Sequence, residues 1–508
     1  MTGRRAWLVY LFAAAAAVAA YLAASAALHR TGFPLDDAWI HQTYARSWVR
    51  TGEWAFQPGE PSAGSTSPLW SALMAGGHLL GIDPVAWSAA LGVLTLAALG
   101  ALGAAALRRL VPGKPGWAFW GGLVLVFEWH LVWAAVSGME TLLASLVAAW
   151  VLVELLEGRR KPDADLPGAT RQIGAPDPLI RGFGLGLLCG LGLWLRPDLL
   201  TLVVPVGIVL PAGRSGVGAA VRALGAFAAG LLVLAVPYLA LNVALSGEIW
   251  PTTFFAKQAE YAAARELPFF GRLAAQLGTP LVGVGLALLP WLAGEFVDAV
   301  RRRRWGELAA YGWVGLMAVL YALRLPVTYQ HGRYMIPVVP VVMILGFAGL
   351  ARHARPGSPR FAPRVAGRTG IVLAAAVLAA FFGLGGRAFA YDVAVIESEM
   401  VAAAEWVAAN TGPDALIAAH DIGALGYFGG RRIVDLAGLV SPEVVPILRD
   451  EAALADLMDA RGVDLFMTLR GWYPDLETGL PVLFETGGRF SPALGGANMV
   501  LYEWILKK

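Results

Sequence analysis

Two adjacent carboxylates follow the first hydrophobic segment of this 508-residue chain. Asp36 and Asp37 lie within residues 35–41, and Tyr44 and Arg46 come one turn further on. Acids at the edge of a membrane bundle are costly to hold near lipid, so the pair is a candidate functional site. Neighbouring carboxylates raise one pKa of the pair, which suits a general base. Alternatively, both acids only complement the dipole of a juxtamembrane helix.

The composition indicates a membrane protein with many spans. Of the residues, 57% are hydrophobic and 15% are charged, and the mean hydropathy is +0.62. Soluble domains average about 25% charged residues, so one large soluble core is excluded. The single cysteine, Cys189, excludes an intrachain disulfide framework. No Cys/His cluster with metal-ligand spacing and no glycine-rich phosphate loop occurs in the sequence.

Eleven segments are apolar and long enough to be transmembrane helices. They are residues 7–28, 85–107, 117–136, 140–156, 181–196, 198–211, 217–245, 279–300, 306–325, 334–351 and 369–389. Several are shorter than the ~20 residues that a bilayer requires, which indicates tilted helices or helices packed within the bundle. We interpret the first segment as a retained anchor because it is longer than a signal-peptide core and more spans follow. Residues 29–67 form the first outer loop, and 68–81 are re-entrant or interfacial.

The net charge of +3 conceals two regions of opposite sign. Residues 1–389 hold 31 Lys and Arg against 19 Asp and Glu, whereas residues 390–508 hold 8 against 17. We therefore expect a transmembrane catalytic module at 1–389 and a separate acidic domain at 390–508. With the N-terminus inside, 21 of the 31 cations fall in inner connections. This positive-inside bias, with an odd number of spans, predicts that the acidic domain lies outside.

The acidic domain has the pattern of a small α/β domain. An amphipathic helix at 400–409 precedes strands at 415–419, 432–436 and 463–468. A helical region at 442–460 separates the second and third strands, and a last strand is expected at 499–505. No nucleophile elbow or phosphate loop occurs in this region. We expect a structural or acceptor-binding role for it rather than catalysis.

Five polar clusters fall on the outer side of the predicted topology. They are residues 36–46, 137–141, 196–198, 250–257 and 329–337. They offer carboxylates for base chemistry and three cations, Arg196, Lys257 and Arg333, for an anionic leaving group. The planar fork of arginine can donate two hydrogen bonds to a phosphate, and lysine supplies a compact charge.

Each of these features also has a structural interpretation. Aromatic rings gather at membrane interfaces in any case, and the side chains of Arg196 and Arg333 could extend to lipid headgroups. Glu140 and Asp198 could be ion-pair partners, which we favour for Asp198. His331 and His420 are more often hydrogen-bonded structural groups than catalysts.

In combination, these motifs resemble the GT-C superfamily of integral membrane glycosyltransferases. The likeness is closest to the mycobacterial terminal arabinofuranosyltransferase type, and looser to the lipopolysaccharide-modifying and mannosyl-transferring branches. The motifs that carry it are Asp36-Asp37 with residues 44–46, then 64–70, 137–141, 196–198, 253–257, 332–334, 420–427 and 435–439. They cover nearly the whole chain in order, and their order and spacing are more specific than any single motif.

The resemblance implies an α-helical membrane fold with about 11 spans and an extracytoplasmic α/β domain. It implies inverting transfer of a hexose or pentose from a polyprenyl-phosphate donor to an envelope glycan, lipid or protein. The expected location is a bacterial cell (inner) membrane, with the N-terminus cytoplasmic and the reaction outside. No nucleic-acid partner is expected.

The resemblance also implies roles for individual residues. Asp37 is the expected general base, and Asp36 is its orienting or substitute partner. The cations that would stabilise the departing phosphate are Arg333, Lys257 and Arg196. Further substrate-binding candidates are His41, Glu140 and Tyr44. Some relatives use a divalent metal at the acid pair. No third acidic ligand is evident in this sequence, so we assign no metal or other cofactor, and a divalent metal stays an open alternative.

A different class of function, a transporter or flippase of lipid-linked sugars, is the alternative. Transporters often contain internal repeats and acids at mid-membrane in broken helices. In this chain no convincing repeat is evident, and the polar clusters lie at one face. The position of the polar residues therefore favours an enzyme.

Overall fold

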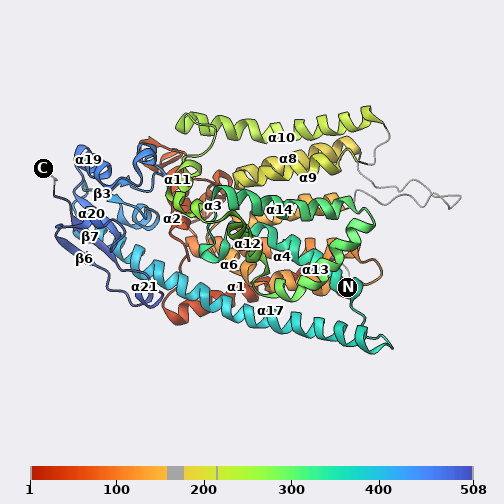
Figure 1. Cartoon of the computed structure of the whole chain (residues 1–508). Coiled ribbons are helices and arrows are strands. Elements are labelled where there is room, and N and C mark those ends of the chain that lie inside the picture. The colour runs from red at the N-terminus through yellow and green to blue at the C-terminus, as the bar shows by residue number, and fades with distance from the viewer. Residues whose placement is uncertain (1–2, 157–176, 213–215, 506–508) are drawn as a thin grey trace.

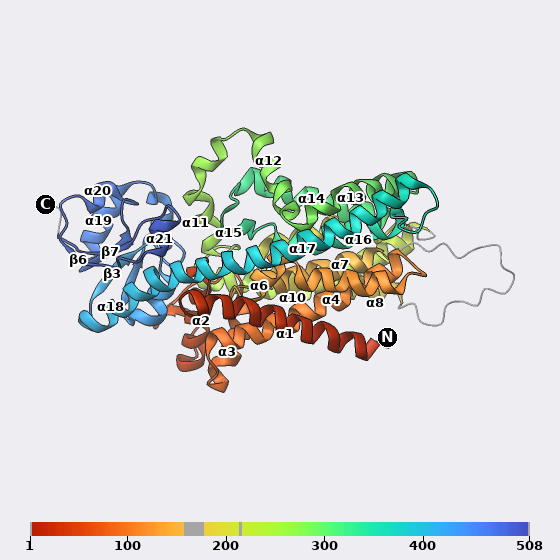
Figure 2. The same cartoon turned by 90° about the horizontal axis from the view of Figure 1, so that it is seen from below.

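A bundle of long apolar helices makes up most of the molecule, and a mixed α/β layer covers one end of it (Figure 1). The structure, a computed structural model, describes residues 3–156, 177–212 and 216–505. Figure 2 shows α17 (Phe361–Ile396) running along the bundle and into the α/β layer. The chain is therefore a polytopic α-helical membrane protein with a C-terminal α/β region.

Seven of the described helices are long and apolar enough to cross a membrane. Their main elements are α1 (Gly3–Leu28), α4 (Pro84–Leu110), α8 (Pro178–Leu195), α10 (Val217–Ser246), α14 (Trp305–Arg324), α16 (Val339–His353) and α17. The span of α16 also includes α15 (Tyr329–Gly332) and η5 (Ile336–Val338).

Four further apolar segments are bent or short. The bent pairs are α5 (Pro115–Phe127) with α6 (Trp129–Ala135), at 56°, and α12 (Phe269–Gly278) and η4 (Thr279–Leu281) with α13 (Val284–Arg301), at 103°. The short ones are α7 (Thr141–Leu156) and η2 (Pro197–Leu202) with α9 (Val203–Val209). Each of the eleven predicted segments corresponds to helix: seven are long spans, two are bent pairs and two are short apolar helices, in agreement with the expectation that several segments are tilted or packed within the bundle. By length and composition the described residues contain seven spans, or up to nine if each bent pair is one span.

The bend between α5 and α6 has a local cause. Glu128 adopts an extended backbone conformation with ψ 124° and caps the second helix, where its side chain accepts a hydrogen bond from the Leu131 backbone N–H. Mean hydropathy does not register such a cap, because the flanking residues are apolar. Segment 68–81 forms one short helix, α3 (Pro68–Leu80), which is too short to cross a bilayer.

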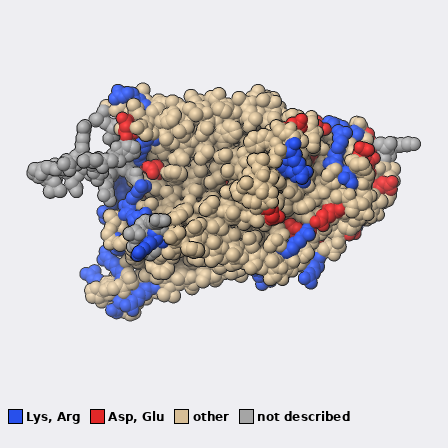
Figure 3. Space-filling view, turned by 180° about the vertical axis from the view of Figure 1, so that it is seen from behind, with Lys and Arg blue, Asp and Glu red and all other residues tan. Residues whose placement is uncertain are grey.

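Lys and Arg side chains gather at the end of the bundle that is remote from the α/β layer (Figure 3). A broad band of uncharged surface separates them from the mixed charges at the other end. This is the distribution expected for a membrane slab with a basic inner face. Five cations counted on the inner side, Arg159, Arg160, Lys161, Arg171 and Arg214, lie outside the described residues.

The C-terminal region is connected to the bundle by the last long helix, α17. α17 continues through the π-helical turn η6 (Glu397–Val401) into α18 (Ala402–Asn410), so the predicted boundary at residue 390 falls inside one helix. Five strands then form a sheet in the order β4-β3-β5-β7-β6. They are β3 (Leu416–Ala419), β4 (Arg432–Asp435), β5 (Leu465–Leu469), β6 (Val482–Glu485) and β7 (Met499–Glu503).

The first three strands in this order are mutually parallel, and β7 and β6 are antiparallel to their neighbours. The helices of this region are η7 (Leu425–Gly429), η8 (Pro442–Ile447), α19 (Glu451–Arg461), α20 (Pro474–Glu477) and α21 (Phe490–Ala493). The sequence predicted every strand of this five-stranded sheet except β6. This strand lies at the sheet edge with exposed Val482 and Leu483, so it lacks the alternation of a half-buried strand.

The two connections that position the site contain helices. The first holds α2 (Asp36–Thr51) and a hairpin of β1 (Ala55–Gln57) and β2 (Glu60–Pro61). The connection after α10 holds α11 (Thr252–Glu260) and η3 (Ala262–Glu266). Trp39 of α2 contacts the rings of Tyr427 and Phe428, with centroids 4.8 and 4.6 Å away. Helix α2 is therefore packed against the α/β layer.

Candidate active site

Asp37 forms an ion pair with Arg333 at the start of α2. Oδ2 of Asp37 accepts a hydrogen bond from Nη2 of Arg333 at 2.6 Å, and the Asp37 side chain stays 26% exposed. Burial by itself would raise the pKa of Asp37, but the charges of Arg333 and Lys257 hold it well below its usual range. Asp37 is therefore an ionised carboxylate that a ligand can reach.

Asp36 faces the C-terminal region. Its Oδ2 accepts from the backbone N–H of Gly423 at 2.6 Å, and its Oδ1 accepts from that of Ala424 at 2.8 Å. Burial, followed by the charge of Asp421, raises the pKa of Asp36 to about 7, and the two N–H donors oppose this rise. Both Asp36 oxygens are thus engaged in fastening the α/β region to α2. The prediction that Asp36 orients or replaces Asp37 is not supported by this geometry.

Arg196, Glu140 and His41 form a second network. Nε and Nη2 of Arg196 each lie 3.0 Å from a carboxylate oxygen of Asp198, and Nη1 lies 3.5 Å from Oε1 of Glu140. Oε2 of Glu140 lies 3.6 Å from Nε2 of His41. Burial keeps the pKa of His41 below its usual value, although the charges of Glu140 and Asp37 act to raise it. Asp198 is the ion-pair partner that the sequence predicted.

Tyr334 joins this network to Asp37. The guanidinium of Arg333 lies 5.1 Å from the Tyr334 ring centroid and that of Arg196 lies 5.6 Å from it. Nη2 of Arg333 also donates to the Tyr334 hydroxyl at 3.2 Å. Nη1 of Arg333 is buried and has no hydrogen-bond partner among the described residues. The site therefore contains an unused cationic donor next to the Asp37 carboxylate.

Lys257 links the site to the C-terminal region through two further residues. Its Nζ lies 3.2 Å from Oε2 of Glu260, and Oε1 of Glu260 lies 3.4 Å from Nε2 of His420. Nδ1 of His420 and the Tyr473 hydroxyl are hydrogen-bonded at 2.7 Å. Burial would lower the pKa of Lys257, but Asp37 and Glu260 keep it above its usual value. Lys257 therefore stays charged within the field of Asp37.

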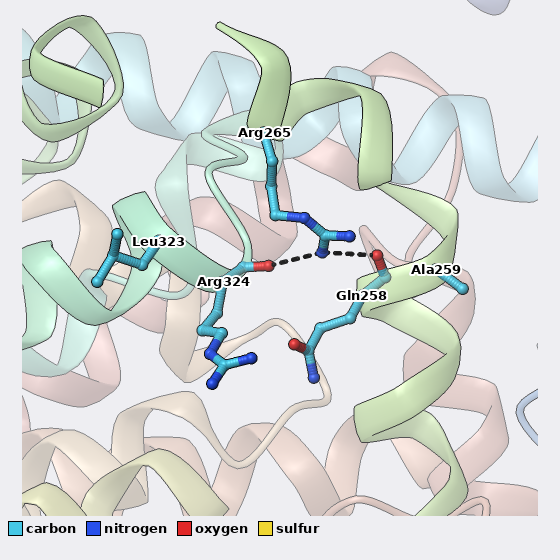
Figure 4. A pocket seen from close by; sticks show the side chains of 5 residues that line it. All are labelled: Gln258, Ala259, Arg265, Leu323 and Arg324. Atoms are coloured by element: carbon cyan, nitrogen blue, oxygen red, sulfur yellow. Dashed lines mark hydrogen bonds between the residues drawn. The ribbon is translucent and has the colours of Figure 1, made fainter. Parts of the chain in front are cut away.

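A cavity of about 580 Å³ lies beside α11 (Figure 4). One residue of its lining, Arg265, forms hydrogen bonds that connect this helix to a neighbouring one. Nη1 of Arg265 donates to the backbone oxygens of Gln258, at 2.9 Å, and Arg324, at 3.4 Å. These bonds connect the helix that carries Lys257 to the end of α14. The cavity is also lined by Ala259 and Leu323.

The backbone that presents Arg333 is left-handed at three consecutive residues. Gln330 has φ 52°, His331 has φ 59° and Gly332 has φ 66°. Non-glycine residues rarely adopt this conformation, which costs roughly 1–2 kcal/mol each. A Cβ at Gly332 would overlap the Thr279 side chain. The surrounding fold therefore imposes the conformation of this loop.

His331 is the anchor of that loop. Its Nε2 lies 2.8 Å from Oδ2 of Asp392 on α17, and Nε1 of Trp133 donates to the same oxygen at 2.9 Å. The His331 ring also lies edge-on to Trp129 and Trp133, with both centroids 5.3 Å away. His331 thus has the hydrogen-bonded structural role that the sequence favoured.

Comparison with known structures gives the fold. ArnT from Cupriavidus metallidurans, solved with undecaprenyl phosphate, matches with a TM-score of 0.60 at 16% identity, over 99% of this chain and 98% of ArnT. The oligosaccharyltransferase of Archaeoglobus fulgidus matches with 0.58 at 10% identity, over 91% of this chain and 69% of that one. The arabinofuranosyltransferase AftD from Mycobacteria matches with 0.50 at 17% identity, over 96% and 39%. The chain has the GT-C fold.

The predicted GT-C architecture is therefore confirmed. The sequence comparisons add one finding, a match of residues 391–502 to a family described only as a domain of unknown function, DUF8728. No curated protein matches the chain.

Within this GT-C fold, Tyr44 does not join the cluster around Asp37. Its hydroxyl lies 2.6 Å from Oγ of Ser62 and accepts from the backbone N–H of Gly64 at 3.0 Å. The side chain is fully buried and shapes the loop that follows the hairpin. The prediction that Tyr44 binds substrate is not supported by this geometry.

Three residues near the site were not among the candidates: Glu260, Tyr321 and Asp421. Glu260 follows Lys257 by three positions on one helix, and that spacing alone signals an ion pair. Tyr321 donates to Asp198 at 2.6 Å, which no local pattern indicates. Asp421 lies in a motif that the sequence singled out, but its place beside α2 depends on how distant segments pack.

The acid pair does not fit a divalent metal. Both oxygens of Asp36 accept backbone N–H groups, and Oδ2 of Asp37 is bonded to Arg333. Divalent cations of the magnesium and calcium type need several converging oxygen ligands. Across residues 3–156, 177–212 and 216–505, no three His, Cys, Asp or Glu side chains are grouped as ligands.

Proposed function

We propose that this chain is an inverting glycosyltransferase. It moves a hexose or pentose from a polyprenyl-phosphate donor to a hydroxyl of an envelope glycan, lipid or protein. The observation that carries the proposal is the pair of Asp37 and Arg333, in which a reachable carboxylate adjoins a buried cation with an unused donor. The GT-C fold supports it, because the similar structure of ArnT was solved with undecaprenyl phosphate.

In the proposed reaction Asp37 is the general base. The acceptor oxygen forms a bond to the anomeric carbon while its proton passes to Asp37. The bond between that carbon and the phosphate oxygen breaks, and the phosphate leaves with the electron pair. Attack opposite to the leaving group inverts the anomeric configuration in one displacement. General base catalysis of this kind contributes typically 10²–10⁴-fold to a rate.

Arg333 would couple donor binding to the strength of this base. Its unused Nη1 is available to a phosphate oxygen, and an arginine can donate to a phosphate through two nitrogens. A bound phosphate would offset the Arg333 charge that now lowers the pKa of Asp37. The pKa of Asp37 would then rise, and the carboxylate would become a better proton acceptor.

Arg196 and Lys257 would act at longer range. Both are already paired, Arg196 with Asp198 and Glu140, and Lys257 with Glu260. We propose that they stabilise the negative charge that develops on the leaving phosphate, without forming bidentate hydrogen bonds to it. His41 would hold Glu140 in place, since Oγ of Ser71 lies 2.8 Å from its other ring nitrogen.

We further propose that the enzyme lies in a bacterial inner membrane with its N-terminus in the cytoplasm and the α/β region outside. The charge-free band between a basic end and a mixed-charge end supports this orientation (Figure 3). The reaction would need no divalent metal, because the acid pair is engaged by Arg333 and backbone N–H groups.

The test is transfer from radiolabelled polyprenyl-phosphate sugars in membranes that contain wild type, Asp37→Asn or Asp414→Asn. Asn at position 37 is isosteric but a poor proton acceptor, so we expect a loss of about 10²–10⁴-fold with intact folding. Asp414 is exposed in the C-terminal region, so its variant is the control and should transfer normally. EDTA should leave the wild-type rate unchanged.

Transfer by Asp37→Asn at the wild-type rate would refute the assignment of the base. If well-expressed wild type transferred no labelled sugar to native membrane acceptors, the enzyme proposal itself would fail. The transporter of lipid-linked sugars would then be the better hypothesis.

A further inference from the structure

Residues 420–424 of the C-terminal region contact the site at two points. On one side Gly423 and Ala424 donate their backbone N–H groups to Asp36, the residue before the proposed base. On the other side His420 pairs with Glu260, the partner of Lys257. A Cβ at Gly423 would overlap the Asp36 backbone, so this close approach requires glycine. Asp421 is thereby held between the two contacts.

Asp421 has a carboxylate oxygen without a partner. Its Oδ2 is buried and forms no hydrogen bond within the described part of the chain. Burial is the main cause that raises its pKa, and the charged groups that act on it include His420, Lys257, Asp37 and Glu260. Asp36 interacts with it as well. A buried carboxylate oxygen without a donor is costly unless a ligand or water supplies one.

The unpartnered groups divide the site into two halves of opposite character. On one side, Nη1 of Arg333 is an unused donor on a residue that is only 5% exposed. On the other side, Asp421 offers an unused acceptor. An anionic phosphate is attracted to the first and repelled by the second, whereas a neutral hydroxyl can donate to a carboxylate. Asp37 interacts electrostatically with both Arg333 and Asp421 and so belongs to both halves.

An exposed indole adjoins the acidic half. Trp472 is 50% exposed, and its ring lies edge-on to His420 with the centroids 5.3 Å apart. A sugar ring can pack its C–H face on such an aromatic surface while its hydroxyls reach a carboxylate. The combination suits a polyhydroxylated, uncharged group.

We propose that Asp421 and Trp472 bind the acceptor, and that the acceptor presents a neutral sugar at its reacting hydroxyl. This inference rests on the proposed glycosyltransferase function and gives residues 391–502 a role in it. The C-terminal region supplies the acceptor half of the site, and the membrane bundle supplies the donor half. Asp37, at the junction, receives the proton.

The test separates acceptor binding from donor binding in the full-length protein in proteoliposomes. The acceptor probes are octyl glucoside, octyl galactoside, octyl mannoside and octyl arabinofuranoside, below their micellar concentrations. The donors are radiolabelled undecaprenyl-phosphate sugars. The variants are Asp421→Asn and Trp472→Ala, with Asp414→Asn as the matched control, since Asp414 is an exposed acid of the same region.

For Asp421→Asn we expect the KM of the octyl glycoside to rise about 10- to 100-fold, as for a lost hydrogen bond to a charged group. The KM of the donor should change less than about twofold. Trp472→Ala should raise the acceptor KM as well, and its exposed position makes misfolding a poor explanation. The control should match wild type in both constants.

Two outcomes would overturn the inference separately from the function. If wild type transfers sugar and Asp421→Asn leaves the acceptor KM unchanged, the acceptor assignment is wrong and the glycosyltransferase stands. An equal rise in donor and acceptor KM would show a general distortion of the site, which also refutes it. If folded wild type transfers to none of the glycosides and to no native membrane acceptor, both proposals fail.

Discussion

At the scale of single residues, the proposed base has an unusual property: its pKa lies below the usual range of an aspartate. Burial favours the neutral acid, yet the charges of Arg333 and Lys257 more than offset it. Asp37 therefore stays ionised across the physiological range, although an acid of low pKa is a weak base. The contribution of this ion pair to stability is present above the unfolded pKa of about 4 and is lost as the pH falls toward the folded value.

The variant Arg333→Gln tests whether the charge of Arg333 keeps the pKa of Asp37 low. Without the arginine charge, burial dominates and the pKa of Asp37 rises, so protonation begins at a higher pH. We expect the acid limb of the kcat/KM profile, which lies below pH 4 in wild type, to move upward so that the rate of the variant falls at acidic pH where that of wild type does not. The measurement is kcat/KM between pH 4 and pH 8. Arg324→Gln is the control because it removes the same charge from an exposed position beside the cavity of Figure 4. An unmoved acid limb in Arg333→Gln would show that another group limits the rate.

At the scale of elements, the site depends on a short loop that the rest of the fold holds in a strained conformation. The loop enters α16 with three left-handed residues, and contacts from α6, η4 and α17 fix it. Strain of this kind persists only where the surrounding structure imposes it. The loop thus transmits the packing of the bundle to the position of Arg333.

Gly332→Ala should disrupt the site without removing any group that takes part in the chemistry. The new Cβ meets the Thr279 side chain at a position with φ 66°, so the loop must shift. A displacement of about 1 Å at a reacting group can cost about 10²-fold, and we expect kcat/KM to fall at least tenfold. The measurements are kcat/KM and the thermal unfolding temperature.

Gly312→Ala is the matched control. Gly312 lies on α14 with open space around its would-be Cβ, so this variant should be neutral or slightly stabilising. Adding Thr279→Ala to Gly332→Ala should restore part of the activity by removing the overlap. Full activity in Gly332→Ala alone would show that the loop does not position Arg333.

At the scale of the whole molecule, charge separates the two ends of the bundle, and the site lies at the end that the α/β region covers (Figures 1 and 3). In the proposed reaction, the lipid of the donor would stay in the membrane and its sugar would reach the site at that end. The orientation of the chain therefore decides on which side of the membrane the product forms.

The single cysteine makes this orientation measurable. Cys189 is buried, so wild type should react little with a membrane-impermeant maleimide. In intact cells we expect labelling of Asp414→Cys, in the exposed part of the α/β region. Arg302→Cys, exposed at the opposite end between α13 and α14, should react only after the membrane is permeabilised. The reverse pattern would place the site in the cytoplasm.

Local sequence patterns predicted most of the helices and strands of this protein and many of its candidate site residues. Long apolar runs predicted the helices, because a bilayer sets both the length and the polarity of a span. Alternating apolar residues predicted the buried strands, and the exposed edge strand β6 lacks that signal. The acids and cations around Asp37 were identified as candidates because charge is rare and costly at a membrane edge.

Other properties depend on contacts between distant parts of the chain. Asp36 and Asp37 are adjacent, but successive helical residues point about 100° apart, so one faces the α/β region and the other Arg333. No spacing rule shows which acid meets which partner. The same holds for Asp421, which comes within the field of Asp37 although 384 positions separate them in the sequence. Sequence patterns report local periodicity and polarity, whereas the pairing of charges depends on packing between remote segments.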